Sequence, residues 1–246
     1  MKIFVYYTPA QVPSLIGSSA GNPQPDCAVA VDVLRATTSI ATALAGGAEA
    51  IEVFADLEAL EQASGKYPSD HILKAAERGG SKVSGYDLGN SPFEYTPAVV
   101  KGKRIFMSTT NGTKALQKIQ EAPHVVTCAL INLKAVAEFI DQTLPNNLWI
   151  ACSGWENSFS LEDTACAGAL IDLLDNNHKI TWGNDEAIGA LALYRQWQNN
   201  LEDLLNLASH GQRLCKLGAS ADLTYCATRN THSIVPRQIA PGVIGL

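Results

Sequence analysis

The chain has 246 residues, of which 46% are hydrophobic, and its formal net charge is -6. This length favours one large α/β domain or two small lobes sharing a cleft, with enough apolar residues for a sizeable core. The acidic balance argues against a nucleic-acid partner, and the apolar runs are too short and interrupted to span a membrane.

The N-terminus and the cysteines favour the cytoplasm. The start, MKIFVYYTPAQVP, lacks the long apolar stretch and the small-residue cleavage site of a secretory signal. The six cysteines include no C-x-x-C pair, so we expect reduced and mostly buried thiols rather than disulfides or a zinc site.

Strand-like and helix-like segments alternate along the chain. Strands are expected at the N-terminus and at residues 29–33, 51–55, 71–76, 104–107, 125–130 and 148–152, with a short strand in the tail. Helices are expected after residue 39 up to Gly46, after Asp56, after residue 113, and at residues 132–142, 161–174, 186–197, 201–207 and 212–217.

This order predicts an α/β fold with three layers, α/β/α, a mostly parallel or mixed central sheet and a helix-rich C-terminal part. Residues 1–246 are expected to form a single domain. The alternative is two lobes that meet near residues 145–155 with the site between them.

Polar clusters follow four of the expected strands. They are Asp32 to Arg35 with Thr37 and Thr38, Glu77 to Gly80, Thr109 to Thr113, and Cys152 to Gly154. Ligands of such sheets bind outside the carboxyl ends of the strands, so we expect these clusters to form one site.

The side chains of these clusters suit a multiply charged oxyanion. Arg35 and Arg78 are fork-shaped donors for phosphate, sulfonate or carboxylate groups. Hydroxyl and amide groups in the sequence TTNGT add further hydrogen bonds, and its Gly112 permits a close approach of the ligand.

Carboxylates in and near the clusters are oxygen ligands of the kind that Mg²⁺ prefers. They are Asp32, Glu77, Glu162 and Asp163. Ordinary structural roles are open for several of these residues: a buried Asp32–Arg35 pair, a simple turn at Asn111 and Gly112, and Glu162 and Asp163 as the acidic first turn of a helix capped by Ser160.

Several common templates are absent from the sequence. It contains no P-loop and no G-x-G-x-x-G, and Asp32 lacks a second aspartate two positions later. Cys152-Ser153-Gly154 lacks the glycine that a nucleophile elbow has two positions before its serine. The five histidines (His71, His124, His178, His210 and His232) fall outside the polar clusters, so neither a histidine nucleophile nor an imidazole-rich metal site is expected.

Five motifs occur in one order: VDVLRATTSI (31–40), ERGG (77–80), GYDLGNSP (85–92), TTNGT (109–113) and CSG followed by SLED (152–163). Together they resemble the 2-phosphosulfolactate phosphatase family, a magnesium-dependent group linked to coenzyme M biosynthesis. The resemblance implies hydrolysis of (2R)-2-phospho-3-sulfolactate to (2R)-3-sulfolactate and phosphate. One departure concerns substrate choice: Trp155-Glu156-Asn157 stands where the family pattern predicts a glycine.

We expect Asp32 to have the central role, as a metal ligand or as a nucleophile that forms an aspartyl phosphate. Arg35 is expected to stabilise charge in the transition state. The expected substrate contacts are Thr37, Thr38, Arg78, Gly79, Asn90, Ser91, Thr110, Asn111, Gly112, Thr113, Ser153 and Gly154. The alternative nucleophile is Cys152, which lacks the C-x₅-R loop of cysteine phosphatases and is expected to be a packed residue.

Other functions stay open at this point. The chain is alternatively a phosphatase for another small phosphorylated 2-hydroxy acid, or a non-catalytic protein that binds a small anion. The acids beside the arginines disfavour the second possibility, because they would repel such a ligand. A homodimer is a mild expectation, since symmetric dimers are the commonest oligomers.

Overall fold

The computed structural model describes residues 1–15, 23–110, 112–177 and 180–246. Asn111, one of the expected substrate contacts, lies outside these residues. The strands are β1 (Lys2–Tyr6), β2 (Cys27–Val31), β3 (Ala50–Val53), β4 (Ile72–Arg78), β5 (Ser81–Lys82), β6 (Arg104–Ser108), β7 (His124–Cys128), β8 (Asn147–Cys152), β9 (Thr181–Trp182), β10 (Arg237–Ala240) and β11 (Val243–Gly245).

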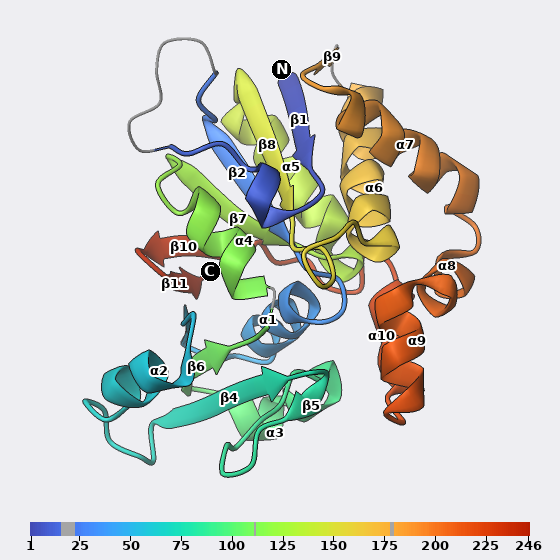
Figure 1. The fold of residues 1–246 in the computed structure, drawn as a ribbon. Coiled ribbons are helices and arrows are strands. Elements are labelled where there is room, and N and C mark those ends of the chain that lie inside the picture. The colour runs from blue at the N-terminus through green and yellow to red at the C-terminus, as the bar shows by residue number, and fades with distance from the viewer. Residues whose placement is uncertain (16–22, 111, 178–179) are drawn as a thin grey trace.

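Helices lie on both sides of the strands (Figure 1). They are α1 (Ala36–Ala45), α2 (Leu57–Ser64), α3 (Pro97–Val100), α4 (Gly112–Ile119), α5 (Leu133–Thr143), α6 (Leu161–Asn177), α7 (Asp185–Trp197), α8 (Leu201–Leu207), α9 (Ser209–Lys216) and α10 (Ser220–Ala227), with 3₁₀ turns η1 (Pro9–Gln11), η2 (Pro92–Glu94) and η3 (Leu130–Asn132). No helix within the described ranges is long and apolar enough to cross a membrane.

The described strands form one mixed sheet in the order β5-β4-β6-β3-β11-β10-β7-β2-β8-β1-β9. Strands β7, β2, β8, β1 and β9 are parallel to one another, as are β3, β6 and β4. The hairpin of β10 and β11 lies between these two groups and pairs with both in the antiparallel sense. The two parallel groups therefore run in opposite directions within the sheet. The sheet is not flat, and Figure 1 shows the arrow of β4 at a steep angle to that of β2.

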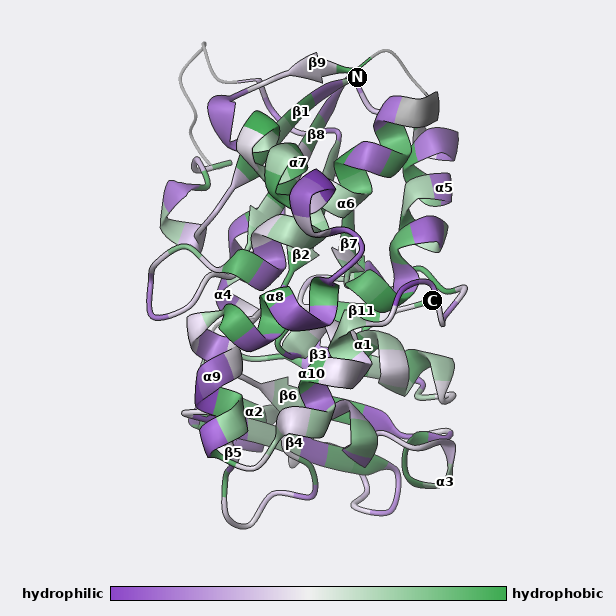
Figure 2. Ribbon diagram, turned by 90° about the vertical axis from the view of Figure 1, so that its right-hand side faces the viewer, coloured by the Kyte–Doolittle hydropathy of each residue, from purple (hydrophilic) through white to green (hydrophobic). Residues whose placement is uncertain are grey.

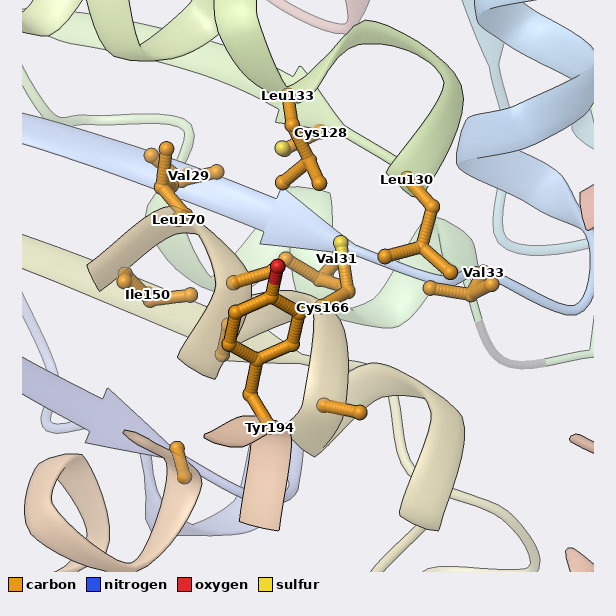
Figure 3. Close-up of a cluster of buried hydrophobic side chains, with 14 of the residues drawn as sticks. Val29, Val31, Val33, Cys128, Leu130, Leu133, Ile150, Cys166, Leu170 and Tyr194 are labelled. Atoms are coloured by element: carbon orange, nitrogen blue, oxygen red, sulfur yellow. The ribbon is translucent and has the colours of Figure 1, made fainter. Parts of the chain in front are cut away.

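Strand β2 is buried along its whole length because both faces of the sheet are covered there. Val29 and Val31 pack on one face against apolar residues of α5 and α6, where Figure 3 shows them beside Leu133, Cys166 and Leu170. The alternate residues of β2 pack on the other face against α1 and α4. In Figure 2 the central strands carry mostly hydrophobic colour, whereas α9, on the outside, carries much hydrophilic colour.

The α/β class, the mixed sheet and the helix-rich C-terminal part are confirmed. Asp56 caps α2 as expected by accepting a hydrogen bond from the amide of Ala59 at 2.8 Å. The tail contributes a hairpin to the middle of the sheet, where a single short strand was expected. Helix α10 was not expected, because its eight residues carry an aspartate on their buried side. The division of the chain into lobes stays a prediction.

Candidate active site

Asp32 follows β2 directly and is buried, with 6% of its surface exposed. One carboxylate oxygen, Oδ1, accepts a hydrogen bond from the amide of Ala36 at 3.1 Å, in the turn that leads into α1. The Thr37 hydroxyl closes the same turn, since it donates to the Asp32 carbonyl at 2.8 Å. Thr37, expected to contact substrate, is thus engaged in holding Asp32 in place.

Burial raises the pKa of Asp32 from 3.8 to about 6. The charge of His210 opposes this rise, while Glu77 and Glu162 add to it. The electrostatic surroundings of Asp32 therefore include two carboxylates, Glu77 and Glu162, and the opposing charge of His210. Carboxylates with perturbed pKa values are typical of functional sites.

Gly112 brings the start of α4 against Asp32. A Cβ atom at this position would lie 2.7 Å from Asp32 Oδ2 and 2.5 Å from the Cβ of Ala36, so a larger residue would push the helix away. Glycine is required here for the close approach of α4 to Asp32, whereas the expectation from the sequence, a close approach of the ligand, stays a prediction. Thr113, also an expected contact, is buried and its hydroxyl donates to the Thr109 carbonyl at 3.2 Å.

Glu77 joins the ends of β4 and β6. Its Oε1 accepts from the amide of Gly80 at 2.5 Å, and its Oε2 accepts from the amide of Thr110 at 3.2 Å. The hydroxyl of Thr110 donates to the same carboxylate at 3.2 Å. The ERGG and TTNGT motifs are therefore in direct contact through Glu77.

Arg35 forms its ion pair with Asp222 of α10, so the Asp32–Arg35 pair considered from the sequence is wrong. Its Nη1 lies 2.6 Å from Asp222 Oδ2, and its Nη2 donates to the carbonyl of Gly80 at 2.7 Å. Both charged side chains are about 95% buried. Ser91, an expected substrate contact, also donates to Asp222, at 2.7 Å.

Four other expected substrate contacts differ in exposure and in hydrogen bonding: Arg78, Gly79, Thr38 and Asn90. Arg78 is exposed, and its guanidinium donates to the Ser108 hydroxyl at 2.9 Å, while Gly79 is exposed beside it. The Thr38 hydroxyl donates to the carbonyl of Val33 at 2.8 Å. The Asn90 side-chain oxygen is buried and has no hydrogen-bond partner among the described residues.

Asp163 ties the end of β8 to the end of β2. Its Oδ1 accepts from the amide of Val33 at 2.8 Å, and its Oδ2 accepts from the amide of Gly154 at 3.0 Å. Burial, followed by the charges of Asp32 and Glu162, raises its pKa well above the usual range. The hydroxyl of Ser153 is buried beside it without a partner among the described residues.

Glu162 points one unpaired oxygen into the protein. Its side chain is 3% exposed, and Oε2 has no hydrogen-bond partner in the described part of the chain. Its Oε1 lies 3.7 Å from Nδ1 of His210, on α9. The prediction that every histidine falls outside the polar clusters is wrong for His210, because α9 folds back onto the start of α6.

Cys152 fits a packed thiol. It is fully buried in the apolar cluster on one face of the sheet. Burial and the nearby carboxylates Asp163 and Glu162 raise its thiol pKa well above 9.0. A thiolate is disfavoured in this position, which supports its expected role as a packing residue.

Within the described residues, no three His, Cys, Asp or Glu side chains are arranged to hold a metal ion by themselves. Mg²⁺ usually keeps several waters and takes one or two carboxylates together with substrate phosphate oxygens. Asp32, with its raised pKa, and Glu162, with its unpaired oxygen, fit that smaller demand. Both oxygens of Asp163 and of Glu77 already accept backbone hydrogen bonds.

Two residues of this site, Asp222 and His210, were not found from the sequence. Both lie in short C-terminal helices, far along the chain from the strand ends that they contact. The rule that ligands bind at strand ends cannot locate them. For Asp222, the sequence places an aspartate beside Leu223 and near Cys226, which are buried with it on one side of α10. An acid next to apolar residues is the signal by which Asp222 could have been found.

The fold and the site define an α/β protein with a buried carboxylate cluster and two arginines where β2, β4, β6 and β8 end. The chain belongs to the 2-phosphosulpholactate phosphatase family, whose model matches residues 14–240. A probable 2-phosphosulfolactate phosphatase of Thermosynechococcus vestitus is 53% identical over 99% of both chains. Proteins with the same description from Synechocystis and Gloeobacter violaceus are 50% and 52% identical, each over 99% of this chain and 99% and 98% of their own.

Proposed function

We propose that the protein hydrolyses the phosphate ester of a small 2-hydroxy acid, and that its substrate is (2R)-2-phospho-3-sulfolactate. The observation that carries the proposal is the burial of Asp32 at the end of β2, against the first residue of α4 and near enough to Glu77 and Glu162 for their charges to raise its pKa. Family membership and the names of the relatives support the substrate.

In this mechanism Asp32 either holds the metal or attacks phosphorus. The attack breaks the ester bond and expels the 2-oxygen of the acid, and water then releases phosphate from the aspartyl phosphate. The turn with Ala36 and Thr37 fixes the carboxylate for either task. Asp32 and Glu162 are the residues that would hold Mg²⁺, which would supply charge neutralisation at the phosphoryl oxygens. Arg78 is an exposed residue whose guanidinium is held by Ser108, and it is proposed to meet the anionic groups of the substrate. Asn90 and Ser153 carry buried polar atoms without partners among the described residues, which suits them to substrate contact.

The test of this proposal is phosphate release from 2-phosphosulfolactate by the purified protein with Mg²⁺. We expect faster release than from other phosphorylated 2-hydroxy acids of similar size. Binding of 2-phosphosulfolactate without release would indicate a receptor instead, and a preference for another phospho-acid would indicate a related phosphatase.

Removal of the metal is expected to stop turnover reversibly. Two buried carboxylates near the phosphate would repel the substrate if nothing neutralised them. Treatment with a chelator, followed by addition of Mg²⁺, should abolish and then restore phosphate release. Activity that survives exhaustive chelation would remove the metal from the mechanism.

A further inference from the structure

Trp155 is held in a fixed position by a tight turn at the end of β8. Its amide donates to the carbonyl of Ser158 at 3.0 Å, and the Ser158 amide donates back to the Trp155 carbonyl at 2.9 Å. Glu156 and Asn157 between them have φ values of 50° and 61°. Two residues of positive φ closing a two-residue loop form a well-defined hairpin turn. The segment Trp155-Glu156-Asn157, which stands where the family pattern predicts a glycine, therefore forms a defined turn.

The indole ring of Trp155 stacks on the imidazole of His210. The ring centroids are 3.8 Å apart and the planes differ by 11°. His210 lies in the first turn of α9, and its Nδ1 faces Glu162 Oε1 at 3.7 Å. The stack thus connects the loop after β8 to the C-terminal helices and to the first turn of α6.

A cavity of about 300 Å³ opens beside this stack. It is lined by Trp155, Phe159, Ser160, Leu161, Glu162, Leu207, Ser209 and His210. Ligand sites have volumes of about 300–1,000 Å³, so this cavity is at the small end of the range. Its walls are aromatic and aliphatic, and the hydroxyls of Ser160 and Ser209 are among its polar groups. Hydroxyl donors in a small cavity suit a compact organic acid better than a flat or extended ligand.

The cavity adjoins the carboxylate cluster. His210 and Glu162 line it, and both act electrostatically on Asp32. Trp155 follows Gly154, whose amide is bound by Asp163. A substrate with its phosphate ester at Asp32 therefore has the cavity available for its other end.

We propose that Trp155 and His210 form the wall of a subsite that receives the end of the substrate opposite the phosphate ester. This wall limits the length of the acid that fits, because the stacked rings occupy the space that a longer chain would need. The inference rests on the proposed function and names the residues that set its substrate size.

The test compares kcat and KM for phosphate esters of 2-hydroxy acids of increasing chain length, including 2-phosphosulfolactate. In Trp155→Ala, kcat/KM for the longest ester relative to the shortest is expected to rise by about tenfold or more, mainly through KM. Trp155→Phe keeps a ring on His210 and should retain the original preference. Trp182→Ala is the matched control, since Trp182 is half-exposed and pairs with the amino end of β1.

Leu207→Trp provides a second variant in case Trp155→Ala does not fold. Leu207 lines the cavity but is 56% exposed, so a larger side chain is tolerated and narrows the space. Its expected effect is opposite, with the longest esters losing most activity. Equal chain-length profiles for Trp155→Ala and Trp182→Ala, or an unchanged profile in Leu207→Trp, would overturn the subsite.

Binding of 3-sulfolactate, measured by calorimetry, separates this inference from the proposed function. If no protein releases phosphate but Trp155→Ala alone weakens 3-sulfolactate binding, the subsite stands and the phosphatase proposal fails. If phosphate is released and Trp155→Ala changes neither binding nor chain-length preference, the subsite fails alone.

Discussion

Asp32→Asn is expected to lower kcat for phosphate release on the order of 10³-fold or more. An amide does not form an acyl phosphate, and it is a poorer Mg²⁺ ligand than a carboxylate, so both proposed roles of Asp32 are lost. The measurement is phosphate release under saturating substrate and Mg²⁺. Cys152→Ala is the matched buried control and should retain most activity, since Cys152 packs in the core.

The concentration of Mg²⁺ distinguishes the two roles. If Asp32 only holds the metal, a large excess of Mg²⁺ restores part of the Asp32→Asn activity by mass action. If Asp32 attacks phosphorus, no Mg²⁺ concentration restores it, and the wild-type protein forms an acid-stable phosphoprotein during turnover. Substantial activity of Asp32→Asn at ordinary Mg²⁺ would contradict both roles.

The same variant should stabilise the metal-free protein at neutral pH. The pKa of Asp32 rises from 3.8 to about 6 on folding, so the folded state binds the proton more tightly than the unfolded state. The resulting contribution to stability is present below the unfolded pKa and is lost as pH rises through about 6, by an upper figure of about 3 kcal/mol. Denaturant unfolding with chelator should therefore show a smaller loss of stability between pH 4 and 7 in Asp32→Asn.

The sequence predicted those parts of the fold whose signal is local. The buried run of β2 and the cap of α2 at Asp56 depend on a few neighbouring residues, and both are confirmed. The hairpin of β10 and β11 was beyond such reasoning, because its short strands are stabilised by pairing with β7 and β3. Strands that are stabilised by partners so distant in the chain need no local pattern of apolar residues from which they could be predicted.

The same limit applies to the candidate site. The strand-end rule selected Asp32 and Glu77, and the charge of Glu77 acts on Asp32 in the structure. Glu162, at the start of α6, acts on Asp32 as well. The rule could not show that Asp163 holds two backbone amides or that Thr38 bonds the carbonyl of Val33, because these roles depend on side-chain direction. The position of polar residues after the strands predicts which of them lie near the site. Their hydrogen-bond partners are known only from the packed structure.

Asp222→Ala is expected to destabilise the protein by about 3–5 kcal/mol. It leaves the guanidinium of Arg35 buried without its carboxylate partner, and it removes the acceptor of the Ser91 hydroxyl. Denaturant unfolding measures the loss. Glu61→Gln is the surface control, since the Lys74–Glu61 pair is 30% and 49% exposed and such pairs contribute about 0.2–1 kcal/mol.

A double variant separates the structural role of this pair from a catalytic one. Replacing Arg35 with methionine and Asp222 with leucine removes both charges, and apolar replacements of buried ion pairs are often neutral or stabilising. We expect the double variant to recover most of the stability lost in Asp222→Ala. If Arg35 also stabilises charge on the substrate, phosphate release stays low in this folded protein. Recovery of activity together with stability would show that Arg35 serves only to join α1, the ERGG turn and α10.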